Sequence, residues 1–163
     1  MNKKLVSAIL AVLFIVSVTP LSLHSVNATG GSWYDGNWSY RKSHTVNPAT
    51  GAGTNYQIRI VVHYGSGSDS GNDVYLSSQC RTDFGDIRFT DSGGQTLLNY
   101  WMESDNASSA AIFWVKVSAD LSSSAQTIYI YYGNPSATSI SNCAATFARL
   151  SYNSHSSYLL SYL

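Results

Sequence analysis

The amino-acid sequence predicts an all-β fold, an antiparallel β-sandwich that resembles a jelly roll. Three observations favour this class. Apolar and polar residues alternate with the period of two that strands show, helix-type spacing is missing, and Gly, Ser, Asn and Asp interrupt the chain at short intervals. The connections between the alternating segments are short, so we expect neighbouring strands to pair antiparallel.

The expected strands follow one another along the chain. They are residues 38–46, 56–64, 86–91, 95–103, 112–118 and 127–132, with a short strand or a single turn at 73–77. Residues 47–54 and 65–72 are rich in Gly, Ser, Thr and Asn, which indicates loops. Ser92-Gly93-Gly94 is expected to close a hairpin, because glycine adopts the positive φ that such turns need.

Alternation also assigns side chains to faces, if the strands around residues 95–103, 110–118 and 127–132 are neighbours in a meander. The expected core face holds Leu98, Tyr100, Met102, Phe113, Val115, Val117, Ile128, Ile130 and Tyr132. The opposite face holds Leu97, Trp101, Glu103, Ile112, Trp114, Lys116, Thr127, Tyr129 and Tyr131, with a Glu103–Lys116 ion pair expected within it.

The aromatic residues of that second face are candidate ligand-binding residues. They are Trp101, Trp114, Tyr129 and Tyr131. A flat sugar ring stacks on indole and phenol rings, and nearby polar groups bind its hydroxyls, so carbohydrate is the ligand that this face favours. The alternative is that a loop, a second sheet or a neighbouring domain covers the face, since aromatic residues are common in strands.

A group of carboxylates gives a second candidate site. Asp83, Asp86, Asp91 and Glu103 could bind Ca²⁺, which takes about six to eight oxygen ligands, or the aspartates could form turns. Glu103 is the only glutamate, and with Asp83 it could nominally serve glycoside hydrolysis. No catalytic motif supports that reaction, so the sequence predicts a non-catalytic protein with calcium as the single candidate cofactor.

The first residues read as a secretory signal peptide. Lys3 and Lys4 precede an apolar stretch at 5–18, and Ala28 ends a small-residue cleavage site. We therefore expect a signal peptide at 1–28, a lead-in at 29–37, a β-sandwich module at 38–147 and an atypical tail at 148–163, truncated or disordered. The expected location is secreted or at the cell surface, with no membrane span in the mature chain.

Charge and cysteine content narrow the function classes further. Removing Lys3 and Lys4 leaves seven basic against nine acidic residues, a net charge of −2 with no basic stripe, so no nucleic-acid partner is expected. The two cysteines, Cys80 and Cys143, can form a disulfide after export or remain separate thiols. Asn37 and Asn106 begin N-x-S/T sequons and are candidate glycosylation sites.

Several motifs in serial order resemble a known family. DFGDIRFTDSGGQTLLNYWMES, IFWVKVSADLSSSAQTIYIYYGNPSATS, the opening WSYRKSHTV and the strand YQIRIVV together are similar to the domain of unknown function 2341, a β module of secreted and cell-surface proteins of archaea and bacteria. The resemblance spans residues 38–147. It implies no assigned activity, and it implies frequent neighbours that are lectin-like, concanavalin-type modules.

These observations converge on an exported, non-catalytic β-sandwich module that mediates binding or adhesion, with carbohydrate as its ligand. Two alternatives remain open at this point. The module could be a structural spacer or docking unit that packs on a neighbouring domain. It could also be part of a polysaccharide-degrading enzyme.

Overall fold

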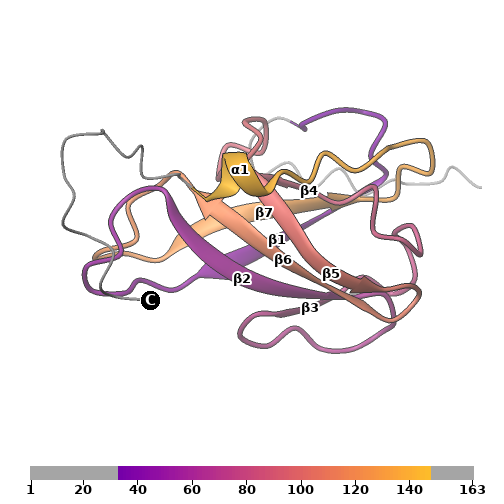
Figure 1. Cartoon of the computed structure of the whole chain (residues 1–163), viewed down its shortest axis with the longest axis horizontal. Helices are drawn as coiled ribbons and strands as arrows, with labels where there is room; N and C mark the ends of the chain where they lie inside the picture. The colour runs from indigo at the N-terminus through magenta and orange to yellow at the C-terminus, as the bar shows by residue number, and fades with distance from the viewer. Residues whose placement is uncertain (1–32, 148–163) are drawn as a thin grey trace, which may run out of the picture.

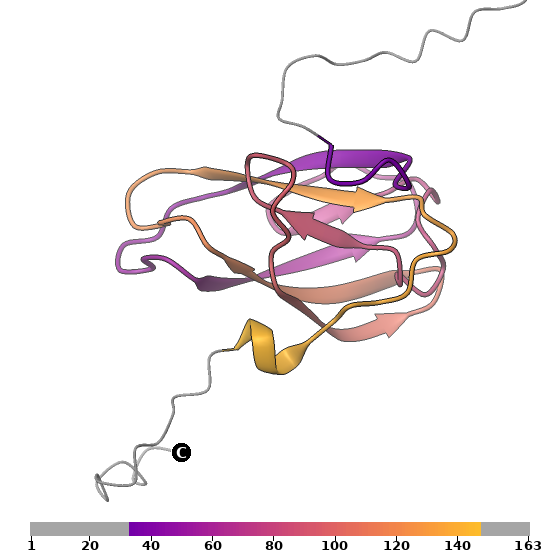
Figure 2. The same cartoon turned by 90° about the horizontal axis from the view of Figure 1, so that it is seen from above.

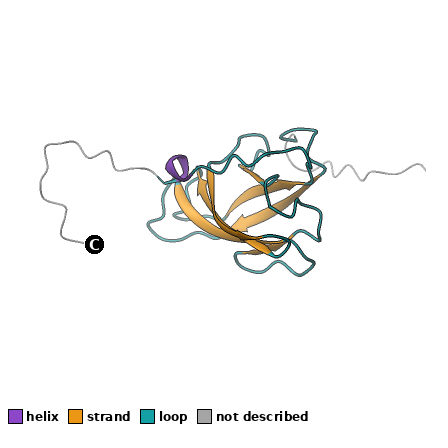
Figure 3. Ribbon diagram, turned by 45° about the vertical axis from the view of Figure 1, so that its right-hand side comes forward, coloured by secondary structure: helices purple, strands orange, loops and turns teal. Residues whose placement is uncertain are grey.

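A computed structural model describes residues 33–147 as two β-sheets packed face to face, with one short helix (Figures 1 and 3). The predicted all-β sandwich is confirmed. The expected signal peptide at 1–28, the residues up to 32 and the atypical tail at 148–163 lie outside the described residues. Within the described part of the chain, no helix is long and apolar enough to cross a membrane.

The strands divide into a three-stranded and a four-stranded sheet. The three-stranded sheet has the order β1-β7-β4, formed by β1 (Tyr40–Val46), β7 (Gln126–Tyr132) and β4 (Arg88–Thr90). The four-stranded sheet has the order β3-β2-β6-β5, formed by β3 (Asp73–Tyr75), β2 (Tyr56–His63), β6 (Ala110–Val117) and β5 (Tyr100–Asn106). Each sheet turns one apolar face toward the other, and these two faces form the core.

The expected core face is largely confirmed by burial. Eight of its nine side chains are buried, and Met102 is half-buried against them. Strand β6 shows the clearest alternation, because Phe113, Val115 and Val117 are buried while the residues between them are only half-buried. Alternation therefore identified the inward side of each strand correctly.

The meander itself is wrong, because β6 and β7 lie in different sheets. β6 pairs with β2 and β5, whereas β7 pairs with β1 and β4. The connection at 118–125 therefore crosses from one sheet to the other. Alternation shows which side of a strand faces the core, but it carries no information about which sheet the strand joins.

The expected hairpin around Gly93 forms only at its closed end. Asp91 N donates to Thr96 O at 3.0 Å and Leu98 N to Phe89 O at 2.8 Å. Beyond these bonds the two arms separate, because β4 stays in the three-stranded sheet and β5 joins the four-stranded one. The predicted turn at residues 92–94 is therefore present, but the arm that follows it continues into the four-stranded sheet.

One strand pair departs from the antiparallel expectation. β3 runs parallel to β2, with Val61, Val62 and His63 beside Asp73, Val74 and Tyr75. The connection at 64–72 folds back so that Asn72 O accepts a bond from Val61 N at 2.8 Å. Gly67 is required in this loop, since a Cβ there would lie 2.4 Å from the Tyr75 ring.

The helix α1 (Cys143–Thr146) was not expected, and it lies against β5 and β6. The Asn142 side chain caps it by accepting a bond from Ala145 N at 3.0 Å. Just before it, Asn142 N donates to Tyr100 O at 2.8 Å, and Ser141 Oγ accepts from Met102 N at 2.8 Å. Figure 2 shows α1 on the opposite side of the sandwich from the first described residues.

Candidate functional site

The four predicted aromatic ligand residues do not form one platform. Trp101 and Trp114 are cross-strand partners in the four-stranded sheet, on β5 and β6. Tyr129 and Tyr131 lie on β7 in the three-stranded sheet. Because all four point away from the core, the two pairs occupy opposite outer faces of the sandwich. The single platform is therefore wrong, and its cause is the mistaken meander.

The tryptophan pair forms a compact aromatic group with Phe147. The Phe147 ring meets Trp101 at a centroid distance of 5.8 Å and 77°, and Trp114 at 5.9 Å and 61°. Both contacts are edge-to-face, the arrangement that aromatic quadrupoles favour. All three side chains are half-buried. We call Trp101, Trp114 and Phe147 the aromatic face; the chain's own α1 region covers part of it and leaves part accessible.

A β-bulge places the glutamate of this face. Met102 pairs with Phe113 and Ser104 with Ile112, so Glu103 is the extra residue between them. Its Oε2 accepts a hydrogen bond from Trp114 Nε1 at 2.8 Å. The expected Glu103–Lys116 ion pair does not form within the described residues. Glu103 instead fixes the orientation of the Trp114 indole.

Two basic residues flank the same indole. Arg59 on β2 is the cross-strand partner of Trp114, and Lys116 lies two residues beyond Trp114 on β6. Sequence reasoning passed over Arg59 and Phe147. The alternation of 56–64 carried a signal for Arg59, since that residue lies on the outward side of its strand. Phe147 had no such signal, because it follows a helix rather than a strand.

Tyr131 has a structural role and is not accessible to a ligand. Its exposed fraction is 0%. The hydroxyl donates to Gly94 O at 2.7 Å and accepts bonds from Tyr34 N and from Arg41 Nη1, both at 3.2 Å. The Trp33 ring meets it edge-on at 5.4 Å. Tyr131 thus joins the lead-in, β1 and the 92–94 turn.

Tyr129 also holds the lead-in rather than a free site. The Arg41 guanidinium lies 4.6 Å from the Tyr129 ring centroid and 4.9 Å from that of Trp33, a cation between two aromatic rings. Trp33 itself is 40% exposed. The described lead-in residues therefore cover the outer face of the three-stranded sheet.

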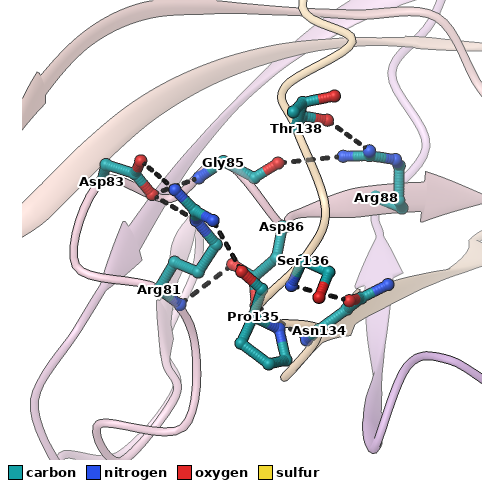
Figure 4. Close-up of polar contacts among 9 residues, drawn as sticks. All are labelled: Arg81, Asp83, Gly85, Asp86, Arg88, Asn134, Pro135, Ser136 and Thr138. Atoms are coloured by element: carbon teal, nitrogen blue, oxygen red, sulfur yellow. Dashed lines mark hydrogen bonds and ion pairs between the residues drawn. The ribbon is translucent and has the colours of Figure 1, made fainter.

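The predicted calcium ligands are not brought together as one site. Asp83 forms a two-bond ion pair with Arg81 at 2.8 and 2.7 Å, and this pair holds the pKa of Asp83 well below its usual range (Figure 4). Asp91 accepts a bond from Thr96 N at 3.4 Å in the turn, while Glu103 accepts from Trp114. No group of three or more His, Cys, Asp or Glu side chains within residues 33–147 could hold a metal ion.

The fourth carboxylate, Asp86, is fully buried and organises the end of the sandwich. Its Oδ1 accepts from Arg81 N at 3.0 Å and its Oδ2 from Asn134 N at 3.2 Å (Figure 4). The same Oδ2 also accepts from Gly133 N at 2.7 Å. The carboxylate replaces the partners that these three backbone N–H groups would otherwise find in water. Its oxygens are therefore occupied by structural bonds rather than available to a cation.

Arg88 is a second buried charge at this end of the molecule. Its Nη2 donates to Thr138 O at 2.6 Å and its Nη1 to Ile87 O at 2.7 Å and Tyr100 Oη at 3.3 Å. The guanidinium also lies 5.1 Å from the Trp38 ring centroid. Arg88 therefore cross-links the two sheets and the segment after β7, which no local sequence pattern indicates.

The two cysteines are free, so the candidate disulfide is not formed. Cys80 is 7% exposed within the core, and burial together with the nearby Asp86 carboxylate raises the pKa of its thiol to about 12. Cys143 is exposed at the first residue of α1. A buried thiol with so high a pKa is unreactive, because only the thiolate attacks. The two sequon residues Asn37 and Asn106 are both exposed.

A cleft of about 290 Å³ opens between the edge strand β1 and the first half of β2. Val46, Ile58 and Leu121 provide its apolar lining, and His44, Gln57 and Arg59 are among its polar residues. Burial lowers the pKa of His44, and the Asp69 charge partly opposes that shift. Arg59 thus borders both the cleft and the aromatic face.

The fold and the site define a class: an all-β sandwich module with an aromatic outer face. Within it, residues 83–157 match the family described as Domain of unknown function (DUF2341). The match confirms the resemblance seen in the sequence and covers both tryptophans, while the motifs at 38–46 and 56–62 precede it. No curated protein and no solved structure matches the chain.

Proposed function

We propose that this protein is an exported, non-catalytic binding module whose aromatic face holds a carbohydrate. The observation that carries the proposal is the cross-strand pair of Trp101 and Trp114, half-buried on the outer face of a rigid sheet. Adjacent strands lie about 4.8 Å apart, and the Phe147 ring packs edge-on against both indoles, so the three rings form one aromatic group. Glu103, Arg59 and Lys116 supply polar groups around it.

The bonds of the two candidate catalytic carboxylates support a binding role over hydrolysis. Asp83 is held by Arg81, and Glu103 is held by the Trp114 indole. A general acid in glycoside hydrolysis needs a raised pKa, whereas the pKa of Asp83 is lowered. Export to the cell exterior is supported by the signal-like sequence at 1–28.

Glycan retention tests the proposal directly. Wild-type protein is expected to bind one or more polysaccharides in a panel of neutral and acidic polymers. Trp101→Ala and Trp114→Ala should each weaken that binding by about tenfold or more, because a buried aromatic anchor carries a large share of binding energy. Trp101→Tyr retains a ring and should keep most of the affinity.

Trp33→Ala is the matched control, because it removes a partly exposed tryptophan from the opposite face. It should leave retention unchanged. The thermal unfolding midpoint of each variant shows whether the sandwich is still folded. Equal losses in Trp33→Ala and Trp101→Ala, or retention that survives both Trp101→Ala and Trp114→Ala, would contradict a glycan site at the aromatic face.

A docking function is the second candidate, and one observation favours it. The chain's own Phe147 already packs on both tryptophans, so this face accepts protein side chains. A docking role predicts that wild type binds no member of the glycan panel. It also predicts that Trp101→Ala makes the segment near α1 easier to cleave in limited proteolysis.

A further inference from the structure

Two basic side chains beside the tryptophan pair determine the charge of the proposed site. On β2, Arg59 lies directly across from Trp114 of β6. Lys116 lies two residues beyond Trp114 on β6, across from Gln57. Arg59 is exposed and Lys116 is half-buried. Within residues 33–147 neither side chain forms a hydrogen bond or an ion pair. Both charges are therefore available to a ligand.

The remaining basic residues of the described chain are occupied elsewhere. Lys42 and Arg81 form ion pairs with aspartates. Arg88 is buried among backbone carbonyls, and Arg41 is stacked between two aromatic rings. Among the described residues, the two cations without a protein partner, Arg59 and Lys116, are thus neighbours of the same tryptophan, Trp114.

The nearby acidic side chain does not neutralise them. Glu103 accepts a bond from the Trp114 indole, and it forms no ion pair with Arg59 or Lys116 in the described part of the chain. Glu103 carries one negative charge, and Arg59 and Lys116 carry two positive charges, so the net charge around the aromatic face is positive. The chain as a whole is neutral by formal charge, so this positive balance is local.

We propose that the aromatic face selects acidic sugars, namely polysaccharides that contain uronate residues. This inference rests on the proposed carbohydrate-binding function and adds the class of glycan. Trp101 and Trp114 contact the ring faces, while Arg59 and Lys116 bind the carboxylates. An arginine can meet a carboxylate with two parallel N–H···O bonds, and Arg59 reaches both the aromatic face and the cleft beside β1.

Matched polymers test the acid preference. Polygalacturonate and alginate are each compared with their fully esterified forms, which keep the backbone and lose the charge. The full chain should bind at least one uronate polymer about tenfold or more tightly than its ester. Arg59→Gln should remove about tenfold of that affinity, Lys116→Gln should act in the same direction, and added salt should weaken binding.

Lys42→Gln is the matched control, because it removes a cation of the other sheet that is paired with Asp69. Equal binding to acid and ester forms, abolished by Trp101→Ala, would overturn the acid preference and leave glycan binding standing. Binding to neutral polymers alone would likewise overturn the acid preference and leave glycan binding standing. Binding that survives Trp101→Ala, or that Lys42→Gln weakens as much as Arg59→Gln does, would show non-selective charge attraction and contradict the inference. Binding to no glycan at all would reject the proposed function together with it.

Discussion

At the residue scale, the buried Asp86 carboxylate joins two segments that are far apart in the sequence. It accepts three backbone N–H groups from two separate segments, around Arg81 and around Gly133. Its neighbour Asp83 accepts two bonds from one exposed guanidinium. The sequence DFGD contains two aspartates three positions apart, yet their different surroundings lead us to expect different contributions to the free energy of unfolding.

Asp86→Ala should therefore lower the free energy of unfolding by about 2–4 kcal/mol, because it leaves buried donors without a partner. Asp83→Ala is the matched control and should have a much smaller effect, since exposed ion pairs are screened by water. Urea unfolding of the two variants gives both values. A loss for Asp83→Ala as large as that for Asp86→Ala would contradict this assignment.

The sequence could predict those features of the candidate site that depend on local patterns, but not those that depend on long-range contacts. Trp101 and Trp114 were found by alternation alone, because their side of the strand is a local property. Their separation from Tyr129 and Tyr131 could not be found, since it depends on which sheet each strand joins. The roles of Asp86 and Arg88 also depend on long-range contacts with residues 133–138.

At the element scale, β7 ends where the backbone adopts a positive φ that favours glycine. Gly133 has φ of +84°, and a Cβ there would lie 2.5 Å from the Tyr40 ring. The Tyr40 ring is itself stacked on Tyr132, with 5.5 Å between centroids. The Gly-Asn-Pro sequence predicted the end of the strand, and the structure adds the reason for glycine.

Gly133→Ala should destabilise the protein by about 1–2 kcal/mol, because a side chain at positive φ meets its own backbone. Gly36→Ala is the matched control, since Gly36 has ordinary φ and no atom near an added Cβ. Thermal unfolding compares the two variants. Indistinguishable midpoints would show that the backbone at Gly133 relaxes without cost.

Element boundaries show where sequence patterning is sufficient. β2 and β7 were predicted nearly to the residue, because each carries sustained alternation or a clear breaker. β5 begins five residues later than the expected 95–103 arm, because the chain changes sheets before pairing resumes at Tyr100. The four residues of α1 are too few to give a helical period.

At the scale of the whole molecule, the cleft between β1 and β2 makes stability depend on pH. Burial lowers the pKa of His44 below its ordinary value of 6.5. In the unfolded chain, His44 therefore binds a proton as the pH falls through about 6.5, whereas in the folded chain it binds that proton only at lower pH. His44 contributes stability above pH 6.5, and that contribution is lost as the pH falls toward its folded pKa.

His44→Gln should accordingly flatten the dependence of unfolding free energy on pH between about pH 7.5 and pH 5. Asp83 does not interfere in this window, because its lowered pKa makes its contribution disappear only below its unfolded value of 3.8. Urea titrations at several pH values measure the slope. A slope that is identical in wild type and His44→Gln would contradict the burial of a neutral imidazole.

The two ends of the described segment are fastened on opposite faces of the sandwich. The lead-in is held by Arg41 between Trp33 and Tyr129, and the end of α1 is held by Phe147 against two indoles. A mechanical load applied between these ends would first meet these ring contacts and the hydrogen bonds beside them, from Tyr34 N to Tyr131 Oη and from Gln57 Nε2 to Thr146 O. The strand ladders would bear the load only afterwards. The module would therefore yield in two stages under tension, with its termini releasing before its sheets separate.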